Sequence, residues 1–362
     1  MRIWSNQSAS ASRRRSSPER VQFETGRGQD VQRGLGRVEE QVYIEILKHM
    51  AEGVYFVDRE RRITYWNPGA EQITGYTSDE VVGHSCSEGI LRHVTEGGHQ
   101  LCLSGCPLAG VMKDGRSRTA SVYLHHKEGH RVPVSVNGQP IQNAEGAIVG
   151  SVELFHPRIS NRFARSDGHR REDAHVDVLT GIGNRRFGEL NLEPVVAAVD
   201  AGVASLGVIF VDVDHFKHIN DRYGHGIGDR VLRMVGQNIA NGLRISDFPI
   251  RWGGEEFLAV LPGADQRSLE QAAERLRMMV EHSWFQEGEV QVRVTVSVGA
   301  TLAVPGEGVN TLIDRADRLM YASKNAGRNL ATTDAGPLPR GGEIPIIGTE
   351  RPWEMPGLSV IR

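Results

Sequence analysis

The first half of the chain alternates apolar and polar residues over short stretches. Between residues 38 and 156 this pattern predicts a helix at 41–50, where Val42, Ile46 and Met50 share one face. It then predicts strands at 54–58, 63–67, 120–125, 132–136 and 148–155. Glycines at turn positions separate the later strands. We therefore expect an antiparallel sheet that holds a few helices on one face, which is an α+β domain.

The second half alternates helices with strands. A turn followed by a helix is expected at 177–200, and the continuous apolar run at 206–211 is typical of a strand covered on both faces. Later apolar residues recur at helical spacing in three sets: Val231, Val235, Ile239 and Leu243; Leu269, Ala272, Ala273, Leu276 and Val280; and Leu312, Ala316, Leu319 and Met320. Val292, Val294, Val296 and Val298 alternate with polar residues, as in one strand. This order predicts an α/β domain with a mixed central sheet flanked by helices.

A length of 362 residues suggests two domains with tails. Residues 1–37 are rich in Ser, Arg and Gln and are expected to form a disordered arm. The domains are predicted at 38–156 and 177–331. The polar segment 157–176 between them is interpreted either as a short signalling helix or as a flexible tether, and the Gly- and Pro-rich segment 332–362 as a flexible tail.

Composition narrows the possible classes of protein. A formal net charge of -3 gives no electrostatic case for binding nucleic acid. No apolar run approaches the length of a membrane span, and the N-terminus lacks an apolar signal core, so a soluble cytoplasmic protein is expected. Three cysteines in a chain of this length do not suggest a disulfide framework.

The strongest chemical signal is the stretch Gly253-Gly254-Glu255-Glu256-Phe257, which lies between two apolar runs. It reads as a hairpin whose turn needs positive φ and close backbone approach, and on its own it could be an ordinary solvated turn. Upstream, the buried strand at 206–211 ends in Asp212, and a carboxylate there is costly unless it meets a cation. If the hairpin lies beside this strand, Asp212 and Glu255 become hard oxygen ligands for Mg²⁺. Two such ions would suit phosphoryl or nucleotidyl transfer.

Further motifs extend this signal from about Asp177 to Asn329. They are the stretch 177–186, Asp212-Val213-Asp214-His215-Phe216-Lys217 with Asn220-Asp221, Tyr223-Gly224-His225 with Gly228-Asp229, Ser297-Val298-Gly299-Ala300, and Tyr321-Ala322-Ser323-Lys324 with Gly327-Arg328-Asn329. In this order they resemble the GGDEF-domain diguanylate cyclases, which make cyclic di-GMP from two GTP. Glu255 replaces the Asp of the family's name and keeps the carboxylate. The resemblance implies a fold similar to class III nucleotide cyclases.

The resemblance also implies roles for individual residues. Asp212, the Val213 carbonyl, Glu255 and Glu256 would hold two Mg²⁺. Glu255 would also help to deprotonate a 3′-hydroxyl, with Glu256 as the second catalytic acid. The expected substrate contacts are the amides of Phe216 and Lys217, the guanine-reading pair Asn220 and Asp229, the lesser contact His225, and the triphosphate ligands Lys324 and Arg328. Four residues apart, Lys324 and Arg328 are expected to share one face of the last helix.

Partners follow from the same resemblance. One site binds one GTP, so the symmetric product needs two domains face to face, and a homodimer is implied. Arg244-Ile245-Ser246-Asp247 matches the family's RxxD inhibitory site, so product feedback is expected there. The alternative to a cyclase is a catalytically silent module that binds GTP or cyclic di-GMP.

The first domain resembles a PAS sensor through Asn67-Pro68-Gly69-Ala70, Gly75-Tyr76 and Val81-Val82-Gly83, followed by a Gly-containing hairpin and a last strand. Cys86, Cys102 and Cys106 all fall, with three histidines, in the region where PAS domains line their cavity. They are interpreted either as a soft-metal, iron–sulfur or thiol redox site, or as small buried thiols without a ligand. In the alternative to a cyclase, this domain would sense a redox state or a metal for the silent module.

Overall fold

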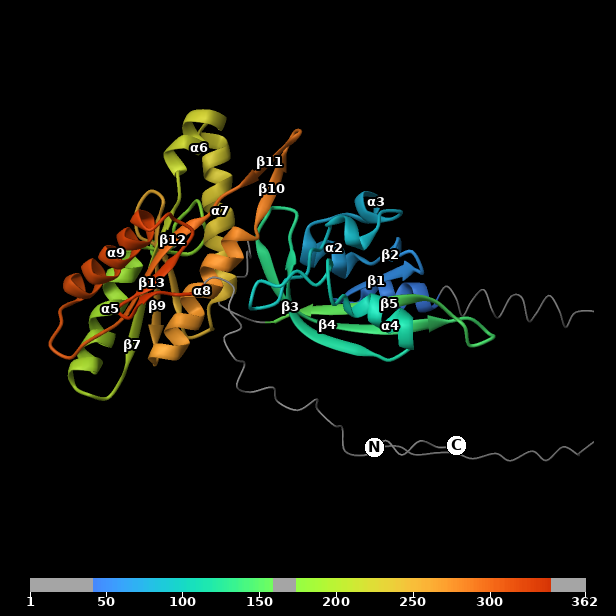
Figure 1. The fold of residues 1–362 in the computed structure, drawn as a ribbon, viewed down its shortest axis with the longest axis horizontal. Coiled ribbons are helices and arrows are strands. Elements are labelled where there is room, and N and C mark those ends of the chain that lie inside the picture. Colours follow the sequence, from blue (N-terminus) through green and yellow to red (C-terminus); the bar gives the residue numbers. More distant parts are fainter. Residues whose placement is uncertain (1–41, 159–173, 340–362) are drawn as a thin grey trace, which may run out of the picture. The chain divides into compact units, whose positions relative to one another are not determined.

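A computed structural model describes residues 42–158 and 174–339 (Figure 1). The arm expected at 1–37, most of the segment 157–176 and the end of the tail lie outside these residues. Residues 42–49 form the predicted first helix. Within the two described ranges, every helix is too short or too polar to cross a bilayer.

The first domain is built on an antiparallel sheet, as predicted. Its order among the described residues is β2-β1-β5-β4-β3. The strands are β1 (Gly53–Asp58), β2 (Ile63–Trp66), β3 (Arg118–His125), β4 (Arg131–Gln142) and β5 (Ile148–Pro157). Between β2 and β3 lie α2 (Pro68–Thr74), α3 (Ser78–Val81), the 3₁₀ turn η1 (Cys86–Glu88) and α4 (Pro107–Asp114).

One apolar core joins these helices to the sheet. Ala70 of α2, Val81 of α3 and Leu108 of α4 are buried with strand residues such as Tyr55 and Phe155 in a single cluster. Because all of them share that cluster, the helices lie on one face of the sheet, which confirms the expectation. Asn67 holds α2 in place, since its buried Oδ1 accepts from the amides of Ala70 and Val54, each at 2.8 Å.

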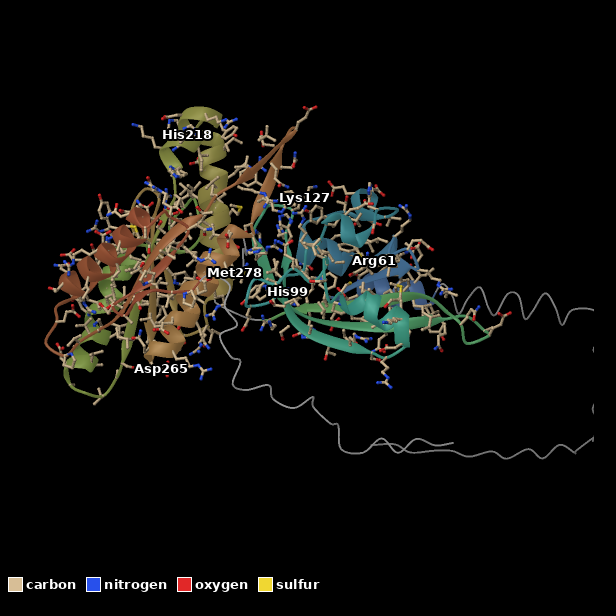
Figure 2. The ribbon with its side chains drawn as sticks, viewed as in Figure 1. Arg61, His99, Lys127, His218, Asp265 and Met278 are labelled. Atoms are coloured by element: carbon tan, nitrogen blue, oxygen red, sulfur yellow. The ribbon has the colours of Figure 1, made fainter. Side chains whose placement is uncertain are left out.

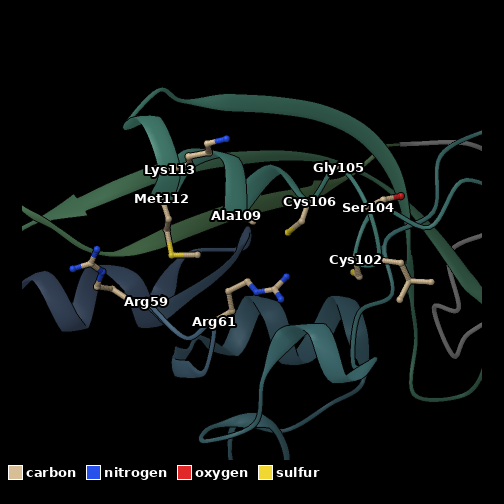
Figure 3. Close-up of a pocket in the computed structure, with 10 residues that line it drawn as sticks. Arg59, Arg61, Cys102, Ser104, Gly105, Cys106, Ala109, Met112 and Lys113 are labelled. Atoms are coloured by element: carbon tan, nitrogen blue, oxygen red, sulfur yellow. The ribbon is translucent and has the colours of Figure 1, made fainter.

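A pocket of about 470 Å³ lies beside α4 and the loop before it (Figure 3). Arg59, Arg61 and Lys113 line it together with Cys102 and Cys106. The third cysteine, Cys86, is buried in the core of the domain. The cysteine-rich region therefore borders a pocket, as the PAS resemblance implied.

The second domain has a mixed sheet, and its order among the described residues is β14-β13-β12-β7-β9-β8-β6. Its strands are β6 (Gly183–Asn184), β7 (Leu206–Val213), β8 (Phe248–Arg251), β9 (Glu256–Pro262), β12 (Val296–Leu302), β13 (Ala331–Thr333) and β14 (Gly336–Pro337), and β10 (Trp284–Glu287) pairs separately with β11 (Val290–Arg293). The helices are α5 (Arg185–Asp200), α6 (Phe216–Tyr223), α7 (His225–Gly242), α8 (Gln266–Glu281) and α9 (Val309–Asn325). Asp265 caps α8 by accepting from the amide of Ser268 at 2.8 Å (Figure 2).

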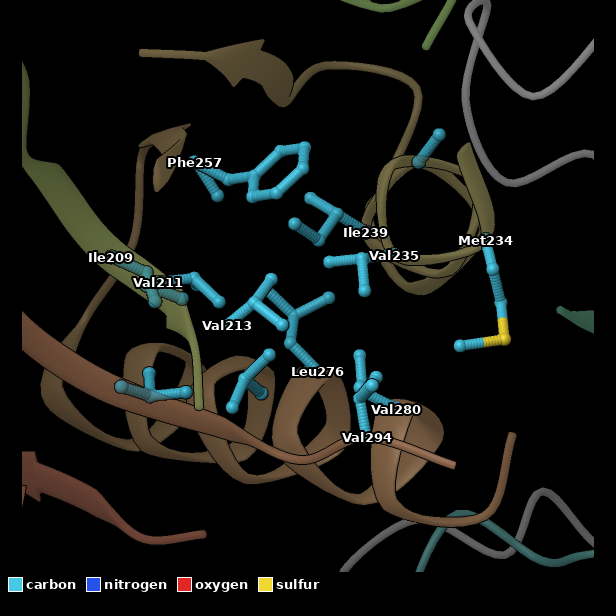
Figure 4. Close-up of a cluster of buried hydrophobic side chains, with 14 of the residues drawn as sticks. Ile209, Val211, Val213, Met234, Val235, Ile239, Phe257, Leu276, Val280 and Val294 are labelled. Atoms are coloured by element: carbon cyan, nitrogen blue, oxygen red, sulfur yellow. The ribbon is translucent and has the colours of Figure 1, made fainter. Parts of the chain in front are cut away.

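Helices cover both faces of this sheet, which explains why β7 is buried throughout and apolar up to Asp212. Ile209, Val211 and Val213 pack with the residues of α7 and α8 in one cluster (Figure 4). Val208 and Phe210 pack with α5 and α9 in another. Side chains alternate along a strand, so Asp212 must lie on the same face as α9. The sheet thus directs this acid toward the last helix.

Two predicted segments had the wrong bounds in this domain. The valines from Val292 to Val298 do not form one strand, because the chain leaves the β10–β11 hairpin at Arg293 and enters the main sheet at Val296. The predicted start of the tail, at residue 332, is too early in the sequence. Thr332 and Thr333 are buried in β13, which pairs with β12. Alternation and Gly content alone could not reveal which sheet each segment joins.

Candidate active site

Two neighbouring strands bring together the acids of two separate motifs. In the β7–β9 pair Asp212 lies opposite Glu256, and the amide of Val213 donates to the carbonyl of Glu255 at 3.3 Å. The register thus places Asp212 beside Glu255 and Glu256, as the sequence analysis required.

The turn with Gly253 and Gly254 connects β8 to β9. Its backbone conformation differs from the one that the sequence analysis predicted. A Cβ on Gly253 would lie 2.6 Å from Glu256 Oε2, so the close neighbour is the tip of a side chain and not the expected backbone. The expected positive φ is wrong, because Gly253 and Gly254 both have ordinary negative or extended backbone conformations. The amides of Trp252 and Gly253 donate to the carbonyl of Glu256 at 2.9 and 3.2 Å and close the turn.

Asp212 is a buried carboxylate in an acidic neighbourhood. It is 6% exposed, and Lys324 Nζ lies 2.8 Å from its Oδ2. Burial raises the pKa of Asp212 to about 6, the Lys324 ammonium opposes that rise, and Glu255 and Glu256 add to it. Burial also raises the pKa of Glu256, with Asp317 and Glu255 contributing. Three carboxylates thus face a single ammonium, and the site favours further positive charge.

The donor set fits Mg²⁺, which prefers carboxylate and carbonyl oxygens. Asp212, Glu255, Glu256 and the Val213 carbonyl supply these atoms from adjacent strand positions. In the described residues these carboxylates do not form a set of three oxygens within 4.8 Å of one another. Lys324 holds Asp212 instead, so a metal would have to compete with this ammonium.

Asp214, two residues beyond Asp212, has a structural role. Its carboxylate accepts from Thr295 Oγ1 and Ser297 Oγ, each at 2.7 Å, and from the amide of Asn329 at 3.0 Å. These contacts join β7 to β12 and to the segment after α9. Asp214 is buried and its hydrogen bonds are satisfied, so it has no need of a cation.

The sequence analysis missed Arg251, which holds the turn of the hairpin. Its Nη2 donates to the Gly254 carbonyl at 2.9 Å, and its Nη1 lies 3.2 Å from both oxygens of Asp177. Asp177 also accepts from the amide and hydroxyl of Thr180. The motif at 177–186 therefore supports the acidic turn through Arg251. A lone Arg before two glycines gives no signal of this connection.

The predicted guanine-reading pair lies on α6 and α7. Asn220 Oδ1 is buried without a hydrogen-bond partner among the described residues. A Cβ on Gly228 would lie 1.9 Å from this oxygen, so only glycine lets α7 approach it. Asp229 and His225 are exposed on α7. An orphaned amide oxygen beside an exposed carboxylate leaves acceptors for a ligand that carries N–H donors.

The expected phosphate contacts have mixed outcomes. His215 has a φ of 57° immediately before α6, so the amides of Phe216 and Lys217 belong to the first turn of a helix, where intrahelical partners are lacking. Arg328 does not share a helical face with Lys324, and that expectation was wrong. Helix α9 ends at Asn325, and Arg328 follows it with a φ of 64°.

The RxxD segment forms a compact loop. The amide of Arg244 donates to Asp247 Oδ2 at 2.8 Å, and Ser246 Oγ donates to Oδ1 at 3.2 Å. Burial raises the pKa of Asp247. Ser268 and Arg275 of α8 line the same depression as Arg244 and Asp247. The depression is thus lined by the hydrogen-bonded carboxylate of Asp247 and by two arginines, Arg244 and Arg275.

The three cysteines do not form a metal site in this structure. Within the described ranges, the one His, Cys, Asp and Glu set whose ligand atoms lie within 4.8 Å of one another excludes all of them. Burial raises the pKa of Cys86 and of Cys102, which keeps both as thiols. Cys86 thus matches the buried-thiol interpretation, whereas Cys102 and Cys106 are half-buried beside the pocket.

The arrangement matches known protein families. Residues 174–330 match the family model described as diguanylate cyclase, GGDEF domain, and residues 51–156 match that of a PAS domain. The chain therefore contains a PAS domain followed by a GGDEF domain. This order of domains is the one that the sequence motifs indicated.

Several relatives are named cyclases. The chain is 35% identical to the response regulator PleD of Caulobacter vibrioides over 195 residues, 53% of this chain and 43% of PleD. It is 30% identical to the probable diguanylate cyclase DgcE of Escherichia coli over 292 residues, 79% of this chain and 25% of DgcE. The chain thus spans less than half the length of these curated relatives.

Among solved structures, the GGDEF domain of DgcB from Caulobacter crescentus in complex with c-di-GMP is 33% identical to this chain. The match covers 46% of this chain and 98% of that one, with a TM-score of 0.44. The active GGEEF domain of a diguanylate cyclase from Vibrio cholerae is 28% identical, and the match covers 41% of this chain and 96% of that one, with a TM-score of 0.39.

Proposed function

We propose that this protein is a diguanylate cyclase, which condenses two GTP into cyclic di-GMP and two pyrophosphates. The observation that carries the proposal is the meeting of Asp212 with Glu255 and Glu256 at the ends of β7 and β9 beside Lys324. The family match and the relatives named as cyclases support the same activity.

Asp212, Glu255, Glu256 and the Val213 carbonyl would hold two Mg²⁺ in the active protein. When bound, the metals supply positive charge to the phosphate oxygens and to the attacking oxygen. Because Lys324 now pairs with Asp212, we infer that Lys324 moves to the triphosphate when the metals enter. Arg328 and the first amides of α6 would bind the remaining phosphate oxygens.

The chain's own groups then position and deprotonate the substrates. Asn220 and Asp229 would bind the guanine edge, with His225 as a lesser contact, and Glu255 would accept the proton of one 3′-hydroxyl. That oxygen forms a bond to the α-phosphorus of the second GTP, and the bond from that phosphorus to the pyrophosphate oxygen breaks. Pyrophosphate leaves with the bonding electrons, and a second attack of the same kind closes the ring.

The reaction needs two sites that face each other, so we propose a homodimer as the active form. We further propose that the product binds at Arg244 and Asp247 and inhibits the enzyme, and that the PAS domain regulates it. The loop geometry at Asp247 supports a guanine contact, because its carboxylate is already fixed by Arg244 and Ser246.

The deciding experiment measures cyclic di-GMP formation from GTP and Mg²⁺ by the purified chain, beside Glu255→Ala, after bound product has been removed. Product from the parent and none from the variant would support the cyclase. GTP binding without turnover in the parent, under both reducing and oxidising conditions, would favour the silent binding module instead.

A further inference from the structure

The hairpin between β3 and β4 holds two histidines directly across from each other. The amide of His126 donates to the carbonyl of His130 at 2.9 Å, and Gly129 completes the loop with a φ of 100°. Such a three-residue loop with a positive-φ glycine is a common hairpin form. Facing residues in a hairpin have neighbouring Cβ atoms, so the backbone itself sets the separation of the two imidazoles.

Contacts within the PAS domain keep this hairpin in place. The amide of Lys127 donates to the Thr74 carbonyl at the end of α2 at 2.8 Å, and the Lys127 ammonium pairs with Glu80 of α3 (Figure 2). His126 packs against Gly75, where a Cβ would lie 2.8 Å from the imidazole Cε1. The loop is therefore supported by two helices of its own domain.

Three side chains of this loop offer metal ligands close together. One ligand atom each from His126, Glu128 and His130 lie within 4.8 Å of one another. The two imidazoles are stacked, with ring centroids 4.2 Å apart and planes at 21°. The amide of Glu128 donates to His126 Nδ1 at 3.1 Å, which orients this ring against the loop, and a metal at Nδ1 would have to displace that amide.

Burial of His126 and His130 favours neutral imidazoles, which can bind a metal, over charged ones. Burial lowers the pKa of His126, against the opposing effect of Glu128, and it lowers the pKa of His130 well below the usual range. Neutral imidazoles bind metals without first losing a proton. His130 is buried, His126 half-buried and Glu128 exposed, so a cation can enter from the side of the carboxylate.

We propose that His126, Glu128 and His130 form a site for a divalent transition metal of the Zn²⁺ class. Two imidazoles and one carboxylate suit Zn²⁺ and its neighbours in the first transition row, whereas Mg²⁺ and Ca²⁺ prefer all-oxygen sites. Zn²⁺ with ligands at about 2.1 Å requires ligand atoms about 3.4 Å apart, so side-chain rotation must bring the atoms somewhat closer. The site leaves a fourth position open. Such a metal would be an input for the sensor domain that does not involve its cysteines.

The test is a Zn²⁺ titration of the full chain against a chromophoric chelator, with excess Mg²⁺ present to occupy the acidic site of the GGDEF domain. We expect one equivalent of Zn²⁺ to bind the parent. Glu128→Gln and His126→Asn should each weaken the affinity by about tenfold or more, since even outer-shell substitutions cost about 10- to 100-fold. Glu128 is exposed, so Glu128→Gln leaves the fold intact, and a thermal melt checks this.

Matched controls separate this loop from the other candidates. His84 and Glu88 form an exposed pair 3.9 Å apart elsewhere in the PAS domain, and His84→Asn with Glu88→Gln should leave the affinity unchanged. Cys102→Ser with Cys106→Ser should also leave it unchanged, and bound Co²⁺ should show no thiolate charge-transfer band.

Equal Zn²⁺ affinity in the parent and the loop variants would overturn the proposal, as would loss of binding in the cysteine variant or no binding by the parent. The titration uses no GTP, so its outcome does not depend on whether the protein is a cyclase.

Discussion

Two regions of this molecule bury a carboxylate on a strand, and they do so with opposite surroundings. Asp212 at the end of β7 lies beside Lys324 and two further acids. Glu153 in β5 of the PAS domain is fully buried, and it accepts from Tyr55 Oη at 3.0 Å with His93 Nε2 at 3.6 Å. Burial raises the pKa of Glu153 to about 7 and lowers that of His93 to about 4.

The difference separates an acid that needs a cation from an acid that stays neutral. Around Glu153 no cation of the described residues balances the charge, since His93 is itself held neutral, and burial therefore favours the protonated carboxyl. Around Asp212 the Lys324 ammonium opposes the rise in pKa whereas Glu255 and Glu256 add to it, so a further cation beside these acids would favour the charged form that a metal requires. A raised pKa alone therefore does not distinguish a site from a buried structural acid, whereas the neighbouring charges do.

The largest effect is expected from Asp212→Asn, which should lower the rate of cyclic di-GMP formation by about a thousandfold, or roughly 4 kcal/mol in the barrier. Loss of one metal ligand is the cause. Stability should change little or rise, because the variant removes one of three crowded carboxylates. Turnover assays and thermal melts of the same preparations measure both.

Asp214→Asn, immediately after the same strand, is the matched control. It breaks a satisfied network of three hydrogen bonds and should cost about 1–3 kcal/mol of stability. A stability loss for Asp212→Asn equal to that of Asp214→Asn, with turnover retained, would mean that Asp212 is structural too.

The second-largest effect is a pH-dependent gain in the stability of the PAS domain in Glu153→Gln. The folded-state pKa is raised, so parent stability falls as pH rises from about 4.5 to about 7, where only the unfolded chain releases the proton. The glutamine keeps an acceptor for Tyr55 and removes the charge. It should stabilise the PAS domain by roughly 3 kcal/mol at about pH 8 and by little at about pH 5.

Denaturant unfolding at the two pH values measures this difference, and basal turnover should be unchanged because Glu153 lies outside the active site. An equal gain at both pH values would show that Glu153 is charged in the folded protein across this range.

The sequence predicted the strands of the first domain and the buried strand before Asp212 because local periodicity marks them, and it predicted the order of the domains and the meeting of Asp212 with Glu255 from ordered motifs. It could not predict that Lys324 now holds Asp212, because that contact joins residues more than a hundred positions apart. The sequence analysis missed the structural roles of Arg251 and Asp214 for the same reason, since their partners lie far away in the sequence. Arg328 was misplaced because helix ends depend on the last turn, which apolar periodicity does not mark.

A third test extends the comparison to a buried oxygen that has no hydrogen-bond partner among the described residues. Asn220→Ala should raise the KM for GTP by roughly 10- to 100-fold, because the amide is proposed to read the guanine edge. The preference for GTP over ITP, which lacks the 2-amino group, should fall in parallel. Equal kinetics for the variant and the parent with both nucleotides would remove Asn220 from the substrate site, and Gly228 would then serve only helix packing.

The smallest effect is expected from Arg244→Ala, beside another buried acid, Asp247. The Asp247 carboxylate is held by the amide of Arg244 and the hydroxyl of Ser246. Arg244→Ala keeps that amide and removes only the guanidinium, so the loop should persist while product binding weakens. We expect about tenfold more cyclic di-GMP for half-inhibition, since one bidentate guanidinium contact contributes about 1–3 kcal/mol.

Arg233→Ala, which changes an exposed arginine on α7, is the matched control and should not shift inhibition. An Arg244→Ala enzyme as sensitive to cyclic di-GMP as its parent would exclude Arg244 from feedback. Asp247 would then be, like Asp214, an acid that serves the fold.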